Sequence, residues 1–207
     1  EKPEIKPLVI EASKSEGCVH EGAVDNTNQS LLIGENGGLA NVVVMVEVAG
    51  AKFEAPEAPV HLDQKGCRFE PHVSVVGVGT TVDFLNSDTI SHNVHTYAAK
   101  NDQFNKIIAA GSKETQKLEK ADRIEIKCDI HPWMNSWLIV TESPFFAVTD
   151  AKGEFKIAGL PAGTHKVEYW HEQLGKNKGE ITVADDGSAN LTLAWGLEAK
   201  SSGRGRR

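Results

Sequence analysis

The sequence predicts an all-β protein made of two β-sandwiches, and three features of the chain lead to this expectation. Short runs rich in Val, Ile and Thr recur along the 207 residues, clusters of Gly, Pro and Asp separate them, and only residues 101–118 could hold a helical turn. Many short strands with regular turns are typical of sandwiches. The expected strands span residues 39–48, 73–78, 80–85, 123–128, 137–141, 154–157, 165–170, 180–183 and 190–195.

Two zones of the chain differ in character. Residues 57–143 carry five of the eight histidines, two of the three cysteines and Met134, whereas residues 144–198 carry hairpin turn signals and no cluster of metal-ligand types. We expect the boundary near Ser143 and Pro144, because proline interrupts a β-ladder. Residues 199–207 are small and basic, and we expect a disordered tail there.

The composition excludes several classes of function. Hydrophobic residues make up 40% and charged residues 25%, and a formal net charge of −7 argues against general nucleic-acid binding. The longest apolar run, residues 42–46, has the length of a strand, so we expect no membrane span. The start at Glu1 is compatible with a removed leader and hence with export. No phosphate-binding loop or nucleophile motif suggests a nucleotide enzyme or hydrolase.

The segment from Cys128 to Met134 is the most informative in the chain. It presents a thiol, the imidazole of His131 and a thioether within seven residues, and these ligand types suit copper. Cys128 ends an alternating strand in which Ile124 and Ile126 share its face, so the thiol should point into the sandwich at its rim. Zinc is a subsidiary possibility, and methionine is a poor ligand for it.

A copper site of this kind needs a second imidazole, and His92 is the candidate. It follows the strand expected at residues 80–85, and the neighbouring Asn93 could hydrogen-bond across to the Cys128 loop. His95 lies three residues further on, so it should point to the opposite face. His61 and His72 are expected to be structural, although a second metal site that includes His72 and His95 stays open.

The paired motifs resemble a known family. Cys-x₂-His-Pro-aromatic-Met at residues 128–134 resembles the amicyanin-type ligand loop of plastocyanin-like cupredoxins, which include bacterial methylamine-utilisation proteins, and residues 81–95 resemble that family's upstream strand and first ligand. The resemblance covers about residues 60–141 and implies a Greek-key β-sandwich. It also implies one type 1 (blue) copper ion held by His92, Cys128, His131 and Met134.

The implied role is that of an electron carrier and not an enzyme. Such a protein works outside the cytoplasm, in the periplasm or beyond, and passes single electrons between redox partners such as a cytochrome or an oxidoreductase. A copper oxidase or nitrite-reducing enzyme would need a second metal site. A structural or copper-handling surface protein is the main alternative, with the copper stored or incidental.

The three cysteines leave one question of pairing open. An odd count outside the cytosol suggests one disulfide and one thiol kept for another purpose. A Cys18–Cys67 bridge would tie the N-terminal segment to the copper domain, whereas a Cys67–Cys128 bridge would remove the thiolate that copper needs. The nearby Trp133 is expected to pack as a lid over the metal rim.

The C-terminal zone resembles a second family of small sandwiches. Residues 147–155 and 159–164 are similar to carboxypeptidase-regulatory-like or CNA-B-like domains, which usually begin with two earlier strands. We therefore expect either a scaffold of residues 1–56 plus 144–198 with the copper domain of residues 57–143 nested inside it, or two domains in series, residues 1–143 and then 144–198. His165 and His171 flank an expected strand and should lie at the surface.

Overall fold

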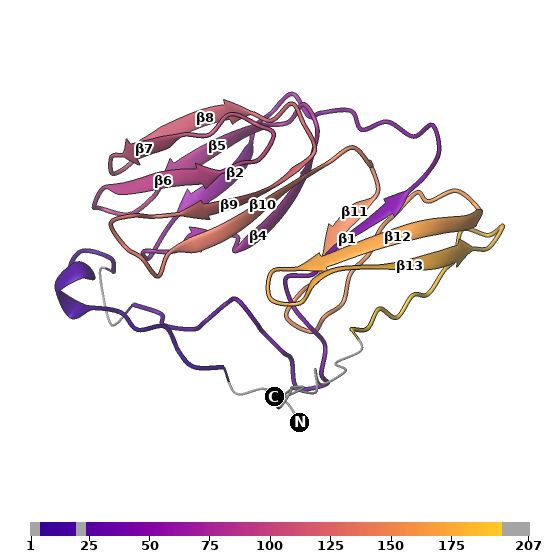
Figure 1. The fold of residues 1–207 in the computed structure, drawn as a ribbon, viewed down its shortest axis with the longest axis horizontal. Helices are drawn as coiled ribbons and strands as arrows, with labels where there is room; N and C mark the ends of the chain where they lie inside the picture. The colour runs from indigo at the N-terminus through magenta and orange to yellow at the C-terminus, as the bar shows by residue number, and fades with distance from the viewer. Residues whose placement is uncertain (1–4, 20–23, 196–207) are drawn as a thin grey trace, which may run out of the picture.

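The computed structural model describes residues 5–19 and 24–195, and these residues form an all-β structure with two lobes (Figure 1). Helical structure in the described residues is limited to one 3₁₀ turn, η1 (Ala12–Lys14). No helix in this part of the chain is long and apolar enough to cross a membrane. The tail expected at residues 199–207 lies outside the described residues.

The larger lobe is a sandwich of two sheets that uses strands between residues 60 and 141 only. Its five-stranded sheet has the order β4 (Val73–Gly77), β10 (Asn135–Thr141), β9 (Asp122–Lys127), β6 (His92–Tyr97) and β7 (Asn105–Ile108). Its four-stranded sheet has the order β3 (Phe69–Glu70), β2 (Val60–Gln64), β5 (Thr81–Asn86) and β8 (Lys113–Lys117). Two pairs, β10 with β4 and β2 with β5, are parallel.

The core of the larger lobe lies between these sheets and extends to the predicted ligands. Ile124 and Ile126 of β9 are fully buried, whereas Glu125 between them is half-buried, so the alternation read from the sequence is confirmed. Phe84 and Leu62 fill the opposite sheet. The same apolar cluster contains Cys128. The thiol therefore points into the sandwich at its rim, because it continues the inward face of β9.

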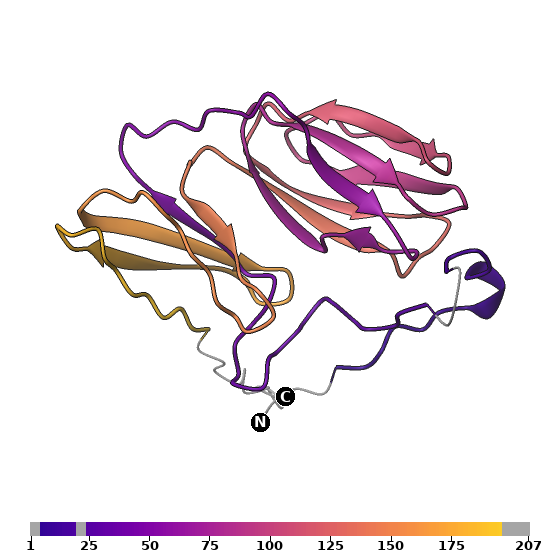
Figure 2. The ribbon, with the colours of Figure 1, turned by 180° about the vertical axis from the view of Figure 1, so that it is seen from behind.

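The smaller lobe contains a single sheet with strands from both sides of the larger lobe in sequence. The sheet order is β11 (Phe146–Val148), β1 (Val43–Glu47), β12 (Gly163–His171) and β13 (Gly175–Val183). β1 pairs antiparallel with β11 and with β12. The chain thus leaves this sheet after β1, builds the larger lobe and returns for the last three strands, as the colours of Figure 2 show.

Both lobes contribute to the junction between them. An apolar cluster joins Val43 and Trp170 of the small sheet to Val73 and Ile139 of the large one. At the edge of this cluster the buried ring of His72 forms an ion pair with the carboxylate of Glu172. The expectation that His171 lies at the surface is wrong: it is completely buried at the end of β12, where its ring contacts the ring of Trp195.

Two further expectations need correction. Residues 101–118 form no helical turn: they contain β7 and β8, each paired along the edge of a sheet. Residues 154–157 and 190–195 are extended without forming strands. Their alternating apolar side chains are half-buried against the core of the small lobe, so the alternation indicated burial and not ladder pairing.

Candidate metal centre

Three predicted ligand side chains meet at the rim of the larger sandwich. The potential ligand atoms of His92, Cys128 and His131 lie within 4.8 Å of one another, and all three residues are buried. His92 opens β6, Cys128 directly follows β9, and His131 lies in the loop that leads to β10. The sheet register brings β6 and β9 side by side, so residues far apart in sequence converge here.

The ligand loop closes on itself through backbone contacts. The N–H of Cys128 donates to the carbonyl of Met134 (3.2 Å), and the N–H of Met134 donates to the carbonyl of His131 (2.9 Å). The N–H of His131 also donates to the sulfur of Cys128 (3.4 Å). Pro132 fixes one backbone dihedral inside this loop. Met134, at the end of the loop, is buried at 1% exposure. The thiol, imidazole and thioether are therefore confined to one tight turn.

The two imidazoles face each other, and Asp88 sets the orientation of one of them. Nδ1 of His92 lies 2.9 Å from Nδ1 of His131. Nε2–H of His92 donates to Oδ2 of Asp88 (2.7 Å), and this carboxylate also accepts the backbone N–H groups of Gly66 and Cys67. Because Nε2 carries the donated proton, Nδ1 keeps a lone pair on the side of the ring that faces His131.

Asp88 is a functional residue that the sequence analysis missed. The signal that could have found it is weak: an acidic residue four positions before a candidate ligand, within the turn that follows β5. Burial raises the pKa of its carboxyl, but the hydrogen bonds from His92, Cys67 and Gly66 outweigh burial and lower the pKa overall. Asp88 is thus a fixed anion beneath the imidazole.

Asn93 links the two halves of the site, as expected from the sequence. Its Oδ1 accepts the backbone N–H groups of Asp129 (2.6 Å) and Ile130 (3.3 Å) and lies 3.3 Å from the sulfur of Cys128. Its Nδ2 donates to the side chains of Asn105 (2.7 Å) and Asp129 (3.1 Å). One buried amide therefore holds the start of the ligand loop against β6.

The thiol of Cys128 is poised to ionise. Burial raises its pKa, but hydrogen bonds with His131 and His92 and from the backbone outweigh burial and lower the pKa to about 6. Burial also lowers the pKa of His92, while its contacts with Asp88 and Cys128 raise the pKa overall. A thiolate beside imidazoles is the form of cysteine that binds metals.

The other histidines of this zone do not join these three residues. His95 points to the other face of β6, stacks on Tyr97 and contacts the carboxylate of Asp129. His72 pairs with Glu172 at the junction of the lobes, and His61 is exposed on β2. Among the described residues, none of these histidines belongs to a group of three or more potential metal ligands. The site that would combine His72 with His95 is therefore not assembled.

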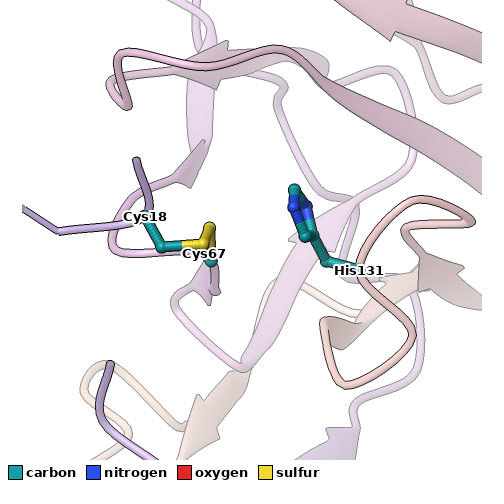
Figure 3. Close-up of side chains that lie close together, drawn as sticks. All are labelled: Cys18, Cys67 and His131. Carbon is teal, nitrogen blue, oxygen red and sulfur yellow. A yellow bond between two sulfur atoms is a disulfide. The ribbon is translucent and has the colours of Figure 1, made fainter. Parts of the chain in front are cut away.

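A disulfide lies beside the three candidate ligands. Cys18 and Cys67 are bonded, and Cys128 is a free thiol, so the first of the two expected pairings is the one present. Figure 3 shows this bridge facing the ring of His131, which is only 3% exposed. Trp133 packs against His131 and donates its indole N–H to the carbonyl of Cys67 (3.1 Å), as expected for a lid.

The donor set fits a soft transition metal. One thiol of low pKa and two imidazole nitrogens converge without an intervening side chain, and a buried thioether lies in the same loop. This combination suits copper better than magnesium or calcium, which prefer oxygen ligands.

Comparison with solved structures finds a partial likeness. No family model and no curated protein matches the chain. Among solved structures, the Cu-containing nitrite reductase NirK from Thermus scotoductus SA-01 is similar over 47% of this chain and 25% of its own, with 27% identity and a TM-score of 0.39. The chain thus matches about a quarter of the length of that enzyme.

Two smaller proteins are similar over nearly their whole length. The Cu(I) form of the M98A mutant of amicyanin matches 47% of this chain and 97% of its own, with 19% identity and a TM-score of 0.38. A purple cupredoxin from Nitrosopumilus maritimus matches 39% and 98%, with 20% identity and a TM-score of 0.35. Less than half of this chain is covered in each case.

Proposed function

We propose that the chain binds one copper ion at a type 1 (blue) site through His92, Cys128, His131 and Met134 and carries single electrons between redox partners. The observation that carries this proposal is a buried, unpaired thiol within 4.8 Å of two imidazole nitrogens. The cysteine supplies the soft anionic ligand, the two histidines complete a trigonal set, and the methionine is the weak axial donor of this arrangement. Bound copper would supply a one-electron couple.

The residues around this site favour electron transfer because they are fixed before any metal binds. Asp88 holds the ring of His92, Asn93 holds the start of the ligand loop, and backbone contacts close the loop between Cys128 and Met134. A rigid ligand set changes little between the two oxidation states, so little energy is spent on rearrangement when an electron moves. These features support a carrier and not an enzyme that must open a coordination position.

We also propose that the protein works outside the cytoplasm and meets its partner beside the ligand loop. A disulfide is typical of oxidising compartments such as the periplasm. Two large apolar side chains, Ile130 in the ligand loop and Ile107 on β7, are exposed at 42% and 72%. Both residues lie next to Asn93, since Asn93 accepts a hydrogen bond from the N–H of Ile130 and is the cross-strand partner of Ile107. A cytochrome or an oxidoreductase could dock there.

The visible absorption spectrum of the oxidised, copper-loaded protein tests the proposal. Charge transfer from Cys128 to copper should give an intense blue or green colour, which Cys128→Ser should lose. His61→Ala is the matched control, because His61 is exposed on β2, away from the ligand loop, and should leave the band unchanged. A copper-loaded wild-type protein that stays colourless after ferricyanide treatment would contradict the proposal.

A further inference from the structure

The disulfide at the mouth of the metal centre brings two more sulfur atoms into reach of its ligands. The sulfurs of Cys18 and Cys67 and a ring nitrogen of His131 all lie within 4.8 Å of one another, and all three residues are buried (Figure 3). The sulfur of Cys67 also lies 4.0 Å from Nε2 of His92. The disulfide therefore lies beside the same imidazoles as the free thiol, and is not a cross-link remote from the site.

The two halves of the bridge are held very differently. Cys67 is completely buried in a tight turn, and its N–H donates to the fixed carboxylate of Asp88 (2.8 Å). Cys18 lies on the N-terminal arm, residues 5–19, whose side chains are mostly exposed or half-buried. Figures 1 and 2 show this arm running along the outside of the larger lobe before the chain returns to β1.

Besides the bridge, few hydrogen bonds join the arm near Cys18 to the larger lobe. The carbonyl of Gly17 accepts a hydrogen bond from Thr89 (3.3 Å), and Gly17 packs against Ile90. The sulfur of Cys18 lies 3.9 Å from the carbonyl of Lys14, and its side chain is buried at the edge of the apolar core of the larger lobe. A segment with few buried contacts opens locally at low cost. Once the bridge is broken, Cys18 can shift while Cys67 keeps its place.

We propose that reduction of the Cys18–Cys67 bridge creates a second soft-metal site, in which the two thiolates bind a Cu(I) ion beside the ring of His131. Thiolates are the ligands that Cu(I) selects, and low coordination numbers suit a pair of sulfurs. Unlike a surface cysteine pair, this pair is buried against an imidazole, so the bound ion would be shielded from solvent. This inference rests on the proposed function, because His131 is also a proposed ligand of the first ion.

The reduction is a two-electron step that needs an external dithiol. The dithiol transfers two electrons and two protons, the sulfur–sulfur bond breaks, and the dithiol becomes a disulfide while Cys18 and Cys67 become thiols. Binding of Cu(I) then displaces the two thiol protons and changes no oxidation state. The chain would thus hold one copper ion when the bridge is oxidised and a second when it is reduced, which links copper loading to the redox state of the compartment.

Anaerobic titration with Cu(I) against a coloured Cu(I) chelator tests this inference. The protein is used either with its bridge intact or after treatment with a dithiol that is removed by gel filtration. We expect about one Cu(I) ion per chain in the oxidised form and about two in the reduced form. The double variant Cys18→Ala/Cys67→Ala should bind about one under both conditions. Circular dichroism checks that the double variant is folded.

A second variant separates this inference from the proposed function. Cys128→Ser removes the thiol of the first site and keeps the bridge, so it should release most of its Cu(I) to the chelator when oxidised and retain about one ion when reduced. Equal copper uptake by oxidised and reduced wild-type protein would overturn the second site while leaving the first intact. Absence of copper from the oxidised wild-type protein would instead contradict the first site.

Discussion

The two lobes of this protein differ in how completely their apolar cores are enclosed by paired sheets. In the larger lobe two hydrogen-bonded sheets enclose one apolar core. In the smaller lobe one sheet is covered by the extended residues 154–160 and 189–195, and a cavity of about 1000 Å³ lies between them. The candidate metal site sits on the fully paired lobe. The lobe that must hold the ligand residues in a fixed geometry is thus the one with two paired sheets. The other lobe, which carries no such residues, tolerates looser packing.

The largest expected effect comes from comparing a core truncation in each lobe. Phe84→Ala removes a ring that is completely buried between the two sheets, and should lower the free energy of unfolding by about 3–5 kcal/mol. Leu193→Ala truncates a half-buried side chain beside the cavity, where little tight packing is lost, and should cost about 1 kcal/mol. Chemical denaturation measures both. Equal losses would show that the small lobe is packed as tightly as the large one.

A pH effect on the metal-free protein should be confined to the larger lobe. The pKa of Cys128 falls from 9.0 to about 6 on folding, so between these pH values the unfolded chain holds a proton that the folded chain has released. Stability from this group therefore rises with pH across this window and is lost as pH falls through about 6, by at most about 4 kcal/mol. Denaturation of the wild type and of Cys128→Ser from pH 6 to 9 measures it.

The two curves of that experiment should diverge as pH rises. Because the serine hydroxyl does not titrate in this range, the variant removes the thiol contribution, together with the part of the pKa shift of His92 that Cys128 causes. Parallel curves would mean that the thiol has an ordinary pKa in the folded protein. The loop around Cys128 would then not be arranged for a thiolate.

Removal of the disulfide tests how far the N-terminal arm belongs to the rigid lobe. The bridge spans 49 residues, so Cys18→Ala/Cys67→Ala should lower stability by about 2–4 kcal/mol. The same variant removes the cover over the ring of His131, so electron exchange of the copper form with a small redox reagent should become faster. Denaturation and stopped-flow mixing measure the two effects. An unchanged exchange rate would show that electrons leave by another face, such as that of Ile130.

The sequence predicted local strand alternation more reliably than contacts between distant parts of the chain, for physical reasons. Alternation along β9 placed the side chains of Ile124, Ile126 and Cys128 on the inward face, because strand periodicity is a local property. Asp88 was missed because its role depends on contacts with His92 and two backbone N–H groups that only the folded turn assembles. His171 was misplaced because its burial involves a contact with the ring of Trp195, a residue distant in the sequence, which no local pattern encodes.

The same reasoning explains the extended segments of the smaller lobe. Leu191 and Leu193 alternate with polar residues and are half-buried, as a strand would be, yet residues 190–195 pair with no neighbour in the described structure. Alternation reports burial of one face, and pairing requires in addition a free sheet edge in the correct register.

We propose that this lobe is a scaffold of residues 1–56 and 144–198 into which residues 57–143 are inserted, since β1 pairs with β11 and β12.

The smallest expected effect concerns the one amide that ties β6 to the ligand loop. Asn93→Ala leaves the N–H groups of Asp129 and Ile130 without their acceptor and should lower stability by about 1–3 kcal/mol. Asn105→Ala is the matched control, because it removes a neighbouring amide that contacts the side chains of Asn93 and Asp129 but leaves the acceptor of the loop N–H groups in place. In the copper form, the charge-transfer band should shift with the first variant and stay with the second. An unshifted band in Asn93→Ala would mean that the loop closure between Cys128 and Met134 holds the ligands without help from β6.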